Sequence, residues 1–235
     1  MFPEIILHSH LFGIGLTVIF YAFAEYLVNR LELNIIPPFV IACPLIIAVL
    51  VYAPDVSYDD YSRGADFINF LLGPSTIALA LPLYRHRQII GKNAAAILGS
   101  VTLASTVAIV TVYLCGTFMG ASPKVLLSLM PKSVTVPIAL DISKHIGGIP
   151  PLTAGAVIFT GMLGATFNHR LLKLCGIKSD LASGIAIGAS SHGLGTSACA
   201  RVSHVQLATA GVAIGLTGIA TSILVPLLLP LLQKL

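Results

Sequence analysis

Charge is scarce in this chain. Only 9% of its 235 residues are charged, against about 25% in an average soluble domain, and tryptophan is absent. Hydrophobic residues make up 56% of the chain, and the mean hydropathy is +0.95. The formal net charge of +4 is too small and too dispersed for a nucleic-acid surface, and the apolar runs leave no room for a soluble domain. The composition therefore predicts an integral membrane protein.

Cysteines and catalytic groups are few as well. The four cysteines lie in or beside apolar runs and have no paired spacing, which argues against a disulfide framework or a metal site. Ser191 and His192 are neighbours in the chain, but no acidic third member of a triad lies in a neighbouring span. We therefore expect a protein that is not an enzyme and that holds no cofactor or metal.

The apolar runs predict an all-α, polytopic membrane protein. The first run has no basic residues before it and no small-residue cleavage motif after it, so we expect it to be a retained span. An additional stretch, 125–145, is ambiguous. At about 20 residues for each span, the candidate membrane elements are 5–27, 35–53, 67–84, 94–118, 152–167, 181–199 and 207–232.

Loop charges orient these spans. Arg85, Arg87 and Lys92 lie in one loop and Arg170, Lys173 and Lys178 in another, and the positive-inside rule places both loops in the cytoplasm. Residues 125–145 must then enter and leave by one face, as a re-entrant hairpin of two short helices. This topology has seven full spans in a bacterial cytoplasmic (inner) membrane, with the N-terminus outside and the C-terminus in the cytoplasm. The alternative is a full span at 125–145, with one basic loop misplaced.

A repeated pattern suggests that the single membrane domain, residues 1–235, consists of two halves, roughly 1–118 and 119–235. Ile-Pro-Pro occurs at 36–38 and again at 149–151, each time at the start of a span. At nearly the same offset, LGPST at 72–76 has a counterpart in IGASS at 187–191. The expected topology makes the repeat inverted, a plan typical of secondary transporters with discontinuous helices. The alternative is chance, because Ile, Pro and Gly are common in this chain.

Polar interruptions mark the expected site. MPKSVTVP at 130–137 places Met130 and Val136 before prolines, so both should be extended, and a helix should restart at Pro137. GASSHGLGT at 188–196 is too polar and too rich in glycine for a lipid-facing helix, and NFLLGPST at 69–76 is a weaker third element. Non-helical backbone persists at membrane depth only where protein buries it or where it lines a watery cavity.

Together the interruptions predict a site for a small organic anion. Lys132 supplies the cation, hydroxyls and amides supply donors, glycines allow close approach of backbone, and His192 could couple transport to protons; sodium coupling is left open. The alternatives are that Ser, Thr and Gly only pack helices together, that Pro74 only kinks a span, and that Lys132 snorkels from a shallow tip. The candidate residues are Asn69, Pro74, Ser75, Thr76, Lys132, Ser133, Thr135, Ser190, Ser191, His192, Gly193, Gly195 and Thr196.

Three motifs in order give the chain a resemblance to the LrgB/CidB family of bacterial membrane proteins. They are LGPSTIALALPLY at 72–84, PKSVTVPIA at 131–139 and SSHGLGT at 190–196, with SYDDY at 57–61 before the first and GGIP at 147–150 after the second. The resemblance covers essentially the whole chain. One departure is that many relatives have an arginine in place of Ala198 and an acid in place of Arg201.

The resemblance implies two functions. Family members are commonly labelled antiholin-like regulators of murein hydrolases and act beside a small LrgA/CidA-type holin-like membrane protein. A plant relative that joins an LrgA-like part to an LrgB-like part is a plastidial glycolate/glycerate translocator. We therefore expect a secondary transporter of small monocarboxylates that works by alternating access and forms a homodimer in the lipid bilayer. The alternative is an antiholin-like regulator of autolysis.

Overall fold

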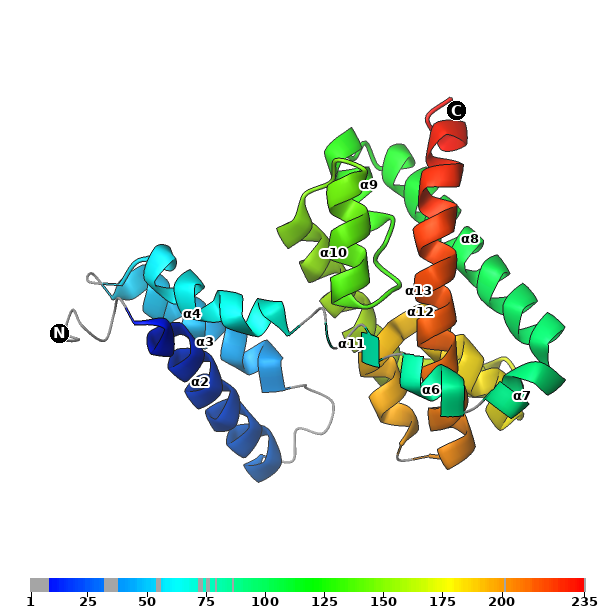
Figure 1. Cartoon of the computed structure of the whole chain (residues 1–235), viewed down its shortest axis with the longest axis horizontal. Helices are drawn as coiled ribbons and strands as arrows, with labels where there is room; N and C mark the ends of the chain where they lie inside the picture. Colours follow the sequence, from blue (N-terminus) through cyan, green and yellow to red (C-terminus); the bar gives the residue numbers. More distant parts are fainter. Residues whose placement is uncertain are drawn as a thin grey trace. The chain divides into compact units, whose positions relative to one another are not determined.

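A computed structural model describes residues 9–31, 38–53, 56–71, 74, 77–78, 80–85, 87–200 and 202–234. Every regular element in these ranges is a helix, which confirms the all-α class. The chain divides into two compact units, Met1–Ser75 and Thr76–Leu235, and each is described by itself (Figure 1). The inverted repeat between residues 1–118 and 119–235 remains a prediction.

The first unit contains α2 (His10–Arg30), α3 (Pro38–Tyr52) and α4 (Tyr58–Phe70). α4 begins with a capping box, in which Ser57 accepts from the Asp60 backbone N–H and the Asp60 carboxylate accepts from the Ser57 N–H. α2 crosses α4 closely because Gly13 and Gly64 face each other's helix, and a Cβ at either position would meet backbone atoms. Small residues of this kind let membrane helices approach.

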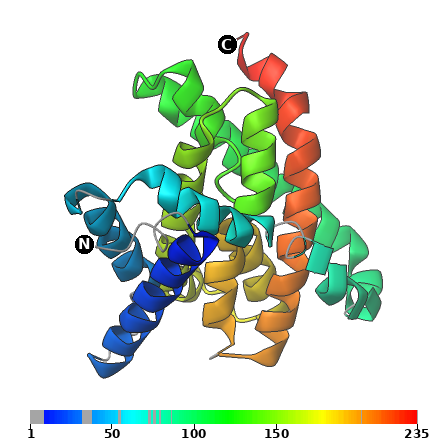
Figure 2. The same cartoon turned by 60° about the vertical axis from the view of Figure 1, so that its left-hand side comes forward.

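The second unit carries the longer helices. Of the described helices, α2, α8, α11 and α13 are long and apolar enough to cross a membrane by length and composition. In the second unit, α13 passes alongside both α10 and α12 (Figure 2). The helices of this unit are α6 (Ala80–Arg85), α7 (Arg87–Lys92), α8 (Ala94–Phe118), α9 (Pro123–Leu129), α10 (Val136–His145), α11 (Pro150–Leu174), α12 (Asp180–Cys199) and α13 (His204–Leu232).

α9 and α10 form a helical hairpin. Residues 130–135, which lie between the two helices, join them at the break that the prolines predict. Ser128 Oγ accepts a hydrogen bond of 2.7 Å from the Ile149 backbone N–H, so the chain returns after α10 to the level of α9. Met130 and Val134, at the turn of the hairpin, are buried with Val157 of α11 in one hydrophobic cluster.

The backbone at Met130 differs from the expectation. Met130 is not extended but has φ −54° and ψ −45°, in the right-handed helical region, and Val136 is already the first residue of α10. The Met130 N–H bonds to the Leu126 carbonyl at 3.1 Å, so Met130 caps α9. A residue that precedes a proline usually avoids the helical region of backbone angles. At Met130 this preference is outweighed by the last hydrogen bond of α9.

α12 doubles back on itself. A straight helix of 20 residues would separate its ends by about 30 Å. Instead, the Ser203 hydroxyl donates to Asp180 Oδ2 at 2.7 Å, and the Ser203 N–H bonds to the Cys199 carbonyl at 3.1 Å, so both ends of α12 lie together. The reversal is at His192, whose φ of 40° and ψ of −139° are not helical. This confirms the predicted break, but residues 181–199 are not a single crossing, contrary to the sequence-based count.

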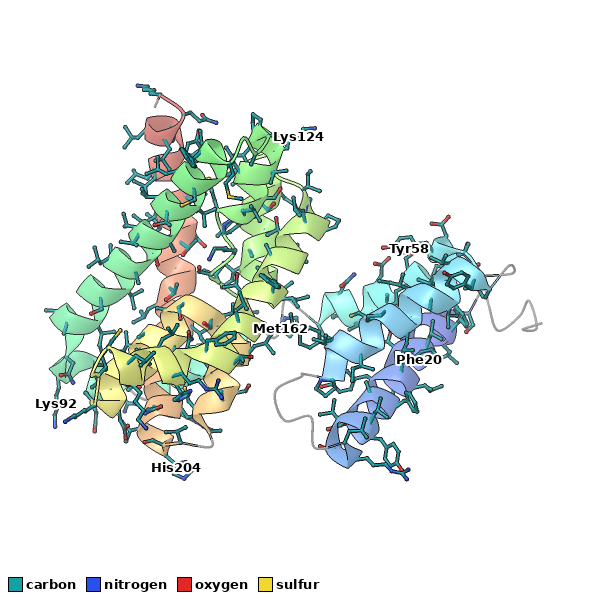
Figure 3. All side chains as sticks on the ribbon, turned by 180° about the vertical axis from the view of Figure 1, so that it is seen from behind. Phe20, Tyr58, Lys92, Lys124, Met162 and His204 are labelled. Carbon is teal, nitrogen blue, oxygen red and sulfur yellow. The ribbon has the colours of Figure 1, made fainter. Side chains whose placement is uncertain are left out.

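The two hairpins open toward opposite ends of the second unit. Lys124, at the start of α9, lies at one end, whereas His204, directly after the base of α12, and Lys92 lie at the other (Figure 3). α13 then runs from the base of α12 to the far end, where the chain terminates (Figure 1). The bent segments of the two hairpins therefore approach each other in the interior of the unit.

Glycines set the spacing between α12 and α13. A Cβ at Gly184 would meet Gln206 and Thr209, and a Cβ at Gly188 would meet the Ala210 backbone carbonyl. We expect Gly188→Ala to lower the free energy of unfolding by about 1–3 kcal/mol, because backbone cannot move aside as a flexible side chain does. Thermal unfolding of the purified protein in detergent measures the change.

Gly99→Ala in α8 is the matched control, because nothing lies within 4 Å of the place that an added Cβ would take. This variant should be as stable as the parent or more stable by up to about 1 kcal/mol, the helix preference of alanine over glycine. Equal stability of the two variants would contradict the close packing of α12 on α13.

Candidate functional site

A cavity of about 950 Å³ lies along one face of α11 in the second unit. Its walls are mostly apolar, with residues such as Leu152, Phe159 and Phe167 from α11. Its polar lining comes from three elements and consists of Lys132, Thr160, Asn168, Ser190 and Ser191. Two polypeptide breaks far apart in sequence, at 130–135 and at His192, thus contribute to one cavity.

Lys132 is the cation of this cavity. Its side chain is partly buried, and its Nζ donates to the Ser133 hydroxyl at 3.5 Å, a long hydrogen bond. Among the residues that the structure describes, no Asp or Glu side chain forms an ion pair with it. A partly buried ammonium without a counter-ion attracts an anion, since its charge is only partly compensated by solvent.

The same cavity is lined by a small network of hydrogen bonds. The Asn168 amide Nδ2 donates to Ser191 Oγ at 2.7 Å and to Ser190 Oγ at 3.3 Å, and the two hydroxyl oxygens are 3.0 Å apart. Ser190 Oγ in turn donates to the Ile187 carbonyl at 3.4 Å. Ser191 therefore keeps a hydroxyl hydrogen that can point to Ser190 or to a ligand.

Asn168 was not predicted from the sequence. It follows the apolar run 152–167 directly and precedes His169 and Arg170, so it reads as the polar end of a span. The sequence shows only that the Asn168 carboxamide stands beside a basic cluster. It does not show that Asn168 faces the serines of α12. That contact depends on how α11 packs against the break in α12.

His192 anchors the break. Its side chain is 5% exposed, and Nε2 donates to the Val157 carbonyl of α11 at 2.9 Å; a carbonyl only accepts, so Nε2 carries the hydrogen. A φ of 40° is unfavourable for a residue with a Cβ and persists only where the surroundings enforce it. Gly161 of α11 leaves room for the ring, since a Cβ there would lie 2.6 Å from His192 Cε1.

Buried hydroxyls without partners occur near the breaks. In the described part of the chain, the fully buried side-chain oxygens and nitrogens that lack a hydrogen-bond partner are Thr135 Oγ1, Thr196 Oγ1 and Thr217 Oγ1. Two of these three residues, Thr135 and Thr196, are predicted site residues. An unpaired buried hydroxyl costs about 1–3 kcal/mol, so a water or a ligand atom is expected beside each of them.

The structure brings some of the predicted residues together. Lys132, Ser190 and Ser191 line one cavity, Ser133 contacts Lys132, and Gly195 packs against Ser191 at the fold-back. His192 and Thr196 are buried beside the break and are not among the cavity-lining residues, and Gly193 has open space around it. A ligand role for these residues remains a prediction.

The third predicted element, residues 69–76, belongs to the first unit except for Thr76, which begins the second. Asn69 is exposed and its amide is 3.4 Å from Asp66 Oδ1, while Pro74 is helical and exposed. Ser75 and Thr76 lie outside the described residues, as does Arg201. Binding of a ligand by residues 69–76 remains a prediction.

Comparison with known proteins gives one family. The LrgB-like family matches residues 17–231. A Haemophilus influenzae protein whose function is uncharacterised is 36% identical over 217 residues, which is 92% of this chain and 94% of that protein. The antiholin-like protein LrgB of Bacillus mycoides is 31% identical over 224 residues, 93% of this chain and 95% of that protein. No solved structure matches the chain.

The strained backbone at His192 gives a test. Glycine adopts φ 40° freely, whereas alanine keeps the strain, and both substitutions remove the imidazole bond to Val157. We expect the H192G variant to be more stable than the H192A variant by about 1–2 kcal/mol, the reverse of the usual order in helices. Chemical or thermal unfolding in detergent measures both.

Ala186→Gly, within the first helical half of α12, is the control and should be destabilising by about 1 kcal/mol. If H192A proves at least as stable as H192G, the reversal of α12 at His192 is incorrect.

Proposed function

The chain belongs to the LrgB-like family, and from this premise we propose that it is a secondary transporter of small monocarboxylates of the glycolate, glycerate, lactate or pyruvate class. Family membership and the four long apolar helices fit a bacterial membrane protein. The observation that carries the proposal is Lys132, an ammonium without a carboxylate partner among the described residues, in a cavity that the two broken elements share.

The chemistry of the cavity suits a carboxylate. The Lys132 ammonium compensates its charge, and the Ser191 hydroxyl, beside the Asn168 amide, keeps a hydrogen that can be donated to a carboxylate, whereas the Ser190 hydroxyl donates to the Ile187 carbonyl. A charge-assisted hydrogen bond contributes about 1.5–3 kcal/mol, more than a neutral one. The apolar walls from α11 accommodate the short carbon chain of such an acid and exclude heavily hydrated inorganic anions.

The two hairpins supply a mechanism for alternating access. α10 and the first half of α12 are each about 15–18 Å long, which is close to half of a hydrocarbon core of about 30 Å. Hairpins that enter from opposite faces bring their bent segments to the midplane, where broken helices of transporters bind substrate. Movement of one hairpin opens the cavity to one face and movement of the other to the opposite face.

Loop charges orient the second unit. Arg170, Lys173 and Lys178 lie where α11 meets α12, and the positive-inside rule places them in the cytoplasm. α12 returns to that face and α13 crosses once, so the C-terminus lies outside. The cytoplasmic C-terminus expected from the sequence counted 181–199 as a crossing, and the doubled-back α12 supports our proposal of an external C-terminus instead. The external N-terminus and the homodimer remain predictions.

A second candidate function rests on the names of relatives. Proteins from Bacillus mycoides and Bacillus cereus that are about 30% identical to this chain are named antiholin-like protein LrgB. Under this function the protein would bind an LrgA/CidA-type holin-like membrane protein and control autolysis. The two functions are compatible, because the flux of an acid can itself regulate a partner.

Transport is tested with purified protein in liposomes. We expect exchange of labelled glycolate, lactate or pyruvate, and we expect Lys132→Ala to raise the KM about 10–100-fold, because the charge-assisted hydrogen bond is lost. Imposed proton and sodium gradients identify the coupling ion. Lys144→Ala is the control, since Lys144 lies exposed on the same hairpin and away from the cavity, and its KM should stay within about twofold.

Folded protein that carries none of these acids would rule out the proposal. If autolysis phenotypes also survive Lys132→Ala in cells, the regulatory function stands without transport. If the substitution abolishes the phenotype while the protein persists in the membrane, regulation depends on the anion site.

The orientation has its own test. Alkaline phosphatase fused after Lys234 should be active, since this enzyme folds only outside the cytoplasm, whereas fusion at Lys178 should be inactive. A fluorescent protein that matures only in the cytoplasm should give the inverse pattern. Activity at Lys178 and none at Lys234 would contradict the proposed orientation, and equal activity at both positions would contradict the single crossing by α13.

A further inference from the structure

A second polar cluster lies at the base of the α12 hairpin, away from the cavity. Its centre is Gln206 on α13, whose side chain is buried. Gln206 Oε1 accepts a hydrogen bond of 3.1 Å from His169 Nε2–H on α11, and Gln206 Nε2 donates to Asp180 Oδ1 at 2.8 Å. The Ser203 hydroxyl donates to the other oxygen of Asp180 at 2.7 Å.

The donors and acceptors in this cluster can be assigned without ambiguity. Hydrogen bonds from Ser203 and Gln206 lower the pKa of the exposed Asp180 carboxyl, so the carboxylate is ionised and only accepts. Gln206 must therefore present its NH₂ group to Asp180 and its oxygen to His169. Reversing the amide would place an acceptor against the carboxylate, so Asp180 fixes the amide, and the amide oxygen in turn requires His169 to donate from Nε2.

The cluster acts on two elements that form the candidate site. His169 is the neighbour of Asn168, whose amide contacts Ser190 and Ser191, and Asp180 is the first residue of the hairpin that carries those serines. A single buried amide thus connects the end of α11 that bears Asn168 with the base of α12. Because both ends of the amide are satisfied, sliding or rotating α11 against α12 would break a partly buried hydrogen bond of a buried side chain.

We propose that Gln206 is a positioning residue, which sets the register of α11 against the α12 hairpin and thereby holds Asn168 against Ser190 and Ser191. It touches no cavity atom itself. The proposal rests on the proposed function in one respect, because it takes Asn168, Ser190 and Ser191 to be the binding site. The register of α11 against α12 exists whether or not the protein carries a substrate.

Disulfide cross-linking measures this register directly. In a background where Cys43, Cys115, Cys175 and Cys199 are replaced by alanine, the pair N168C and S191C reports whether the two positions meet in the membrane. Oxidation should join the pair rapidly in the otherwise unchanged chain. Gln206→Glu places a carboxylate against Asp180 and should slow cross-linking at least about fivefold.

A reciprocal exchange tests the specific bond. With Asp180→Asn added to Gln206→Glu, the asparagine amide can donate to the new carboxylate, which still accepts from His169, so cross-linking should return to within about twofold of the parent rate. His169→Phe keeps a ring but removes the N–H, and should slow cross-linking as Gln206→Glu does. This second variant tests the proposal even if Gln206→Glu does not fold.

Ser203→Ala separates positioning from simple loss of stability. Ser203 caps α13 and bonds to Asp180, and its described side-chain hydrogen bonds do not reach α11, so its loss should lower the melting temperature and leave the cross-linking rate within about twofold. In chains with intact Asn168 and Ser191, Gln206→Glu should also raise the KM for the transported acid about tenfold, with recovery in the double variant.

Each outcome decides the proposal. Unchanged cross-linking in Gln206→Glu and His169→Phe, or a double variant no better than the single one, overturns the positioning role. Slowing by Ser203→Ala to the same extent also overturns it, because the effect would follow stability alone. If cross-linking behaves as expected but no acid is carried, the transport function fails and the positioning role stands.

Discussion

The hydrogen bond from His192 to the Val157 carbonyl holds the turn on which the second unit depends. A residue with a side chain does not keep a φ of 40° unless its neighbours enforce it, and here the ring is enclosed by α11 and fixed to its backbone. Because the chain reverses at this point, Ser203 can reach Asp180, and α13 can begin beside the start of α12. The packing of α12 against both α11 and α13 follows from that reversal.

Glycine makes the reversal sterically feasible. Gly161 and Gly164 of α11 lie where the ring of His192 and the side chain of Ser191 pack, and Gly195 lets the returning half of α12 approach the first half. In lipid, small residues give helices the close contact that the hydrophobic effect does not supply. Of the two glycines that the sequence predicted for close approach to a ligand, Gly195 packs against Ser191, whereas Gly193 has open space around it.

The charge of Lys132 distinguishes this cavity from an apolar gap between helices. Breaking a helix and burying an ammonium both cost free energy in a membrane. The breaks at residues 130–135 and in α12, together with the Lys132 ammonium, all lie at one cavity. A purely structural bundle gains nothing from this arrangement, whereas an anion that binds Lys132 offsets part of the cost.

The sequence by itself determined the helical class, the four long apolar helices α2, α8, α11 and α13, and the positions of both breaks, because apolar length and proline or glycine preferences act over a few residues. It also identified Lys132, Ser190 and Ser191 from their polarity among apolar residues. It did not identify Asn168 or Gln206, whose hydrogen bonds are with residues more than 20 positions away in the chain. Only the tertiary structure decided that α12 turns back and does not cross, because the direction of a chain after a break depends on long-range contacts, here those of His192 with Val157 and of Asp180 with Ser203.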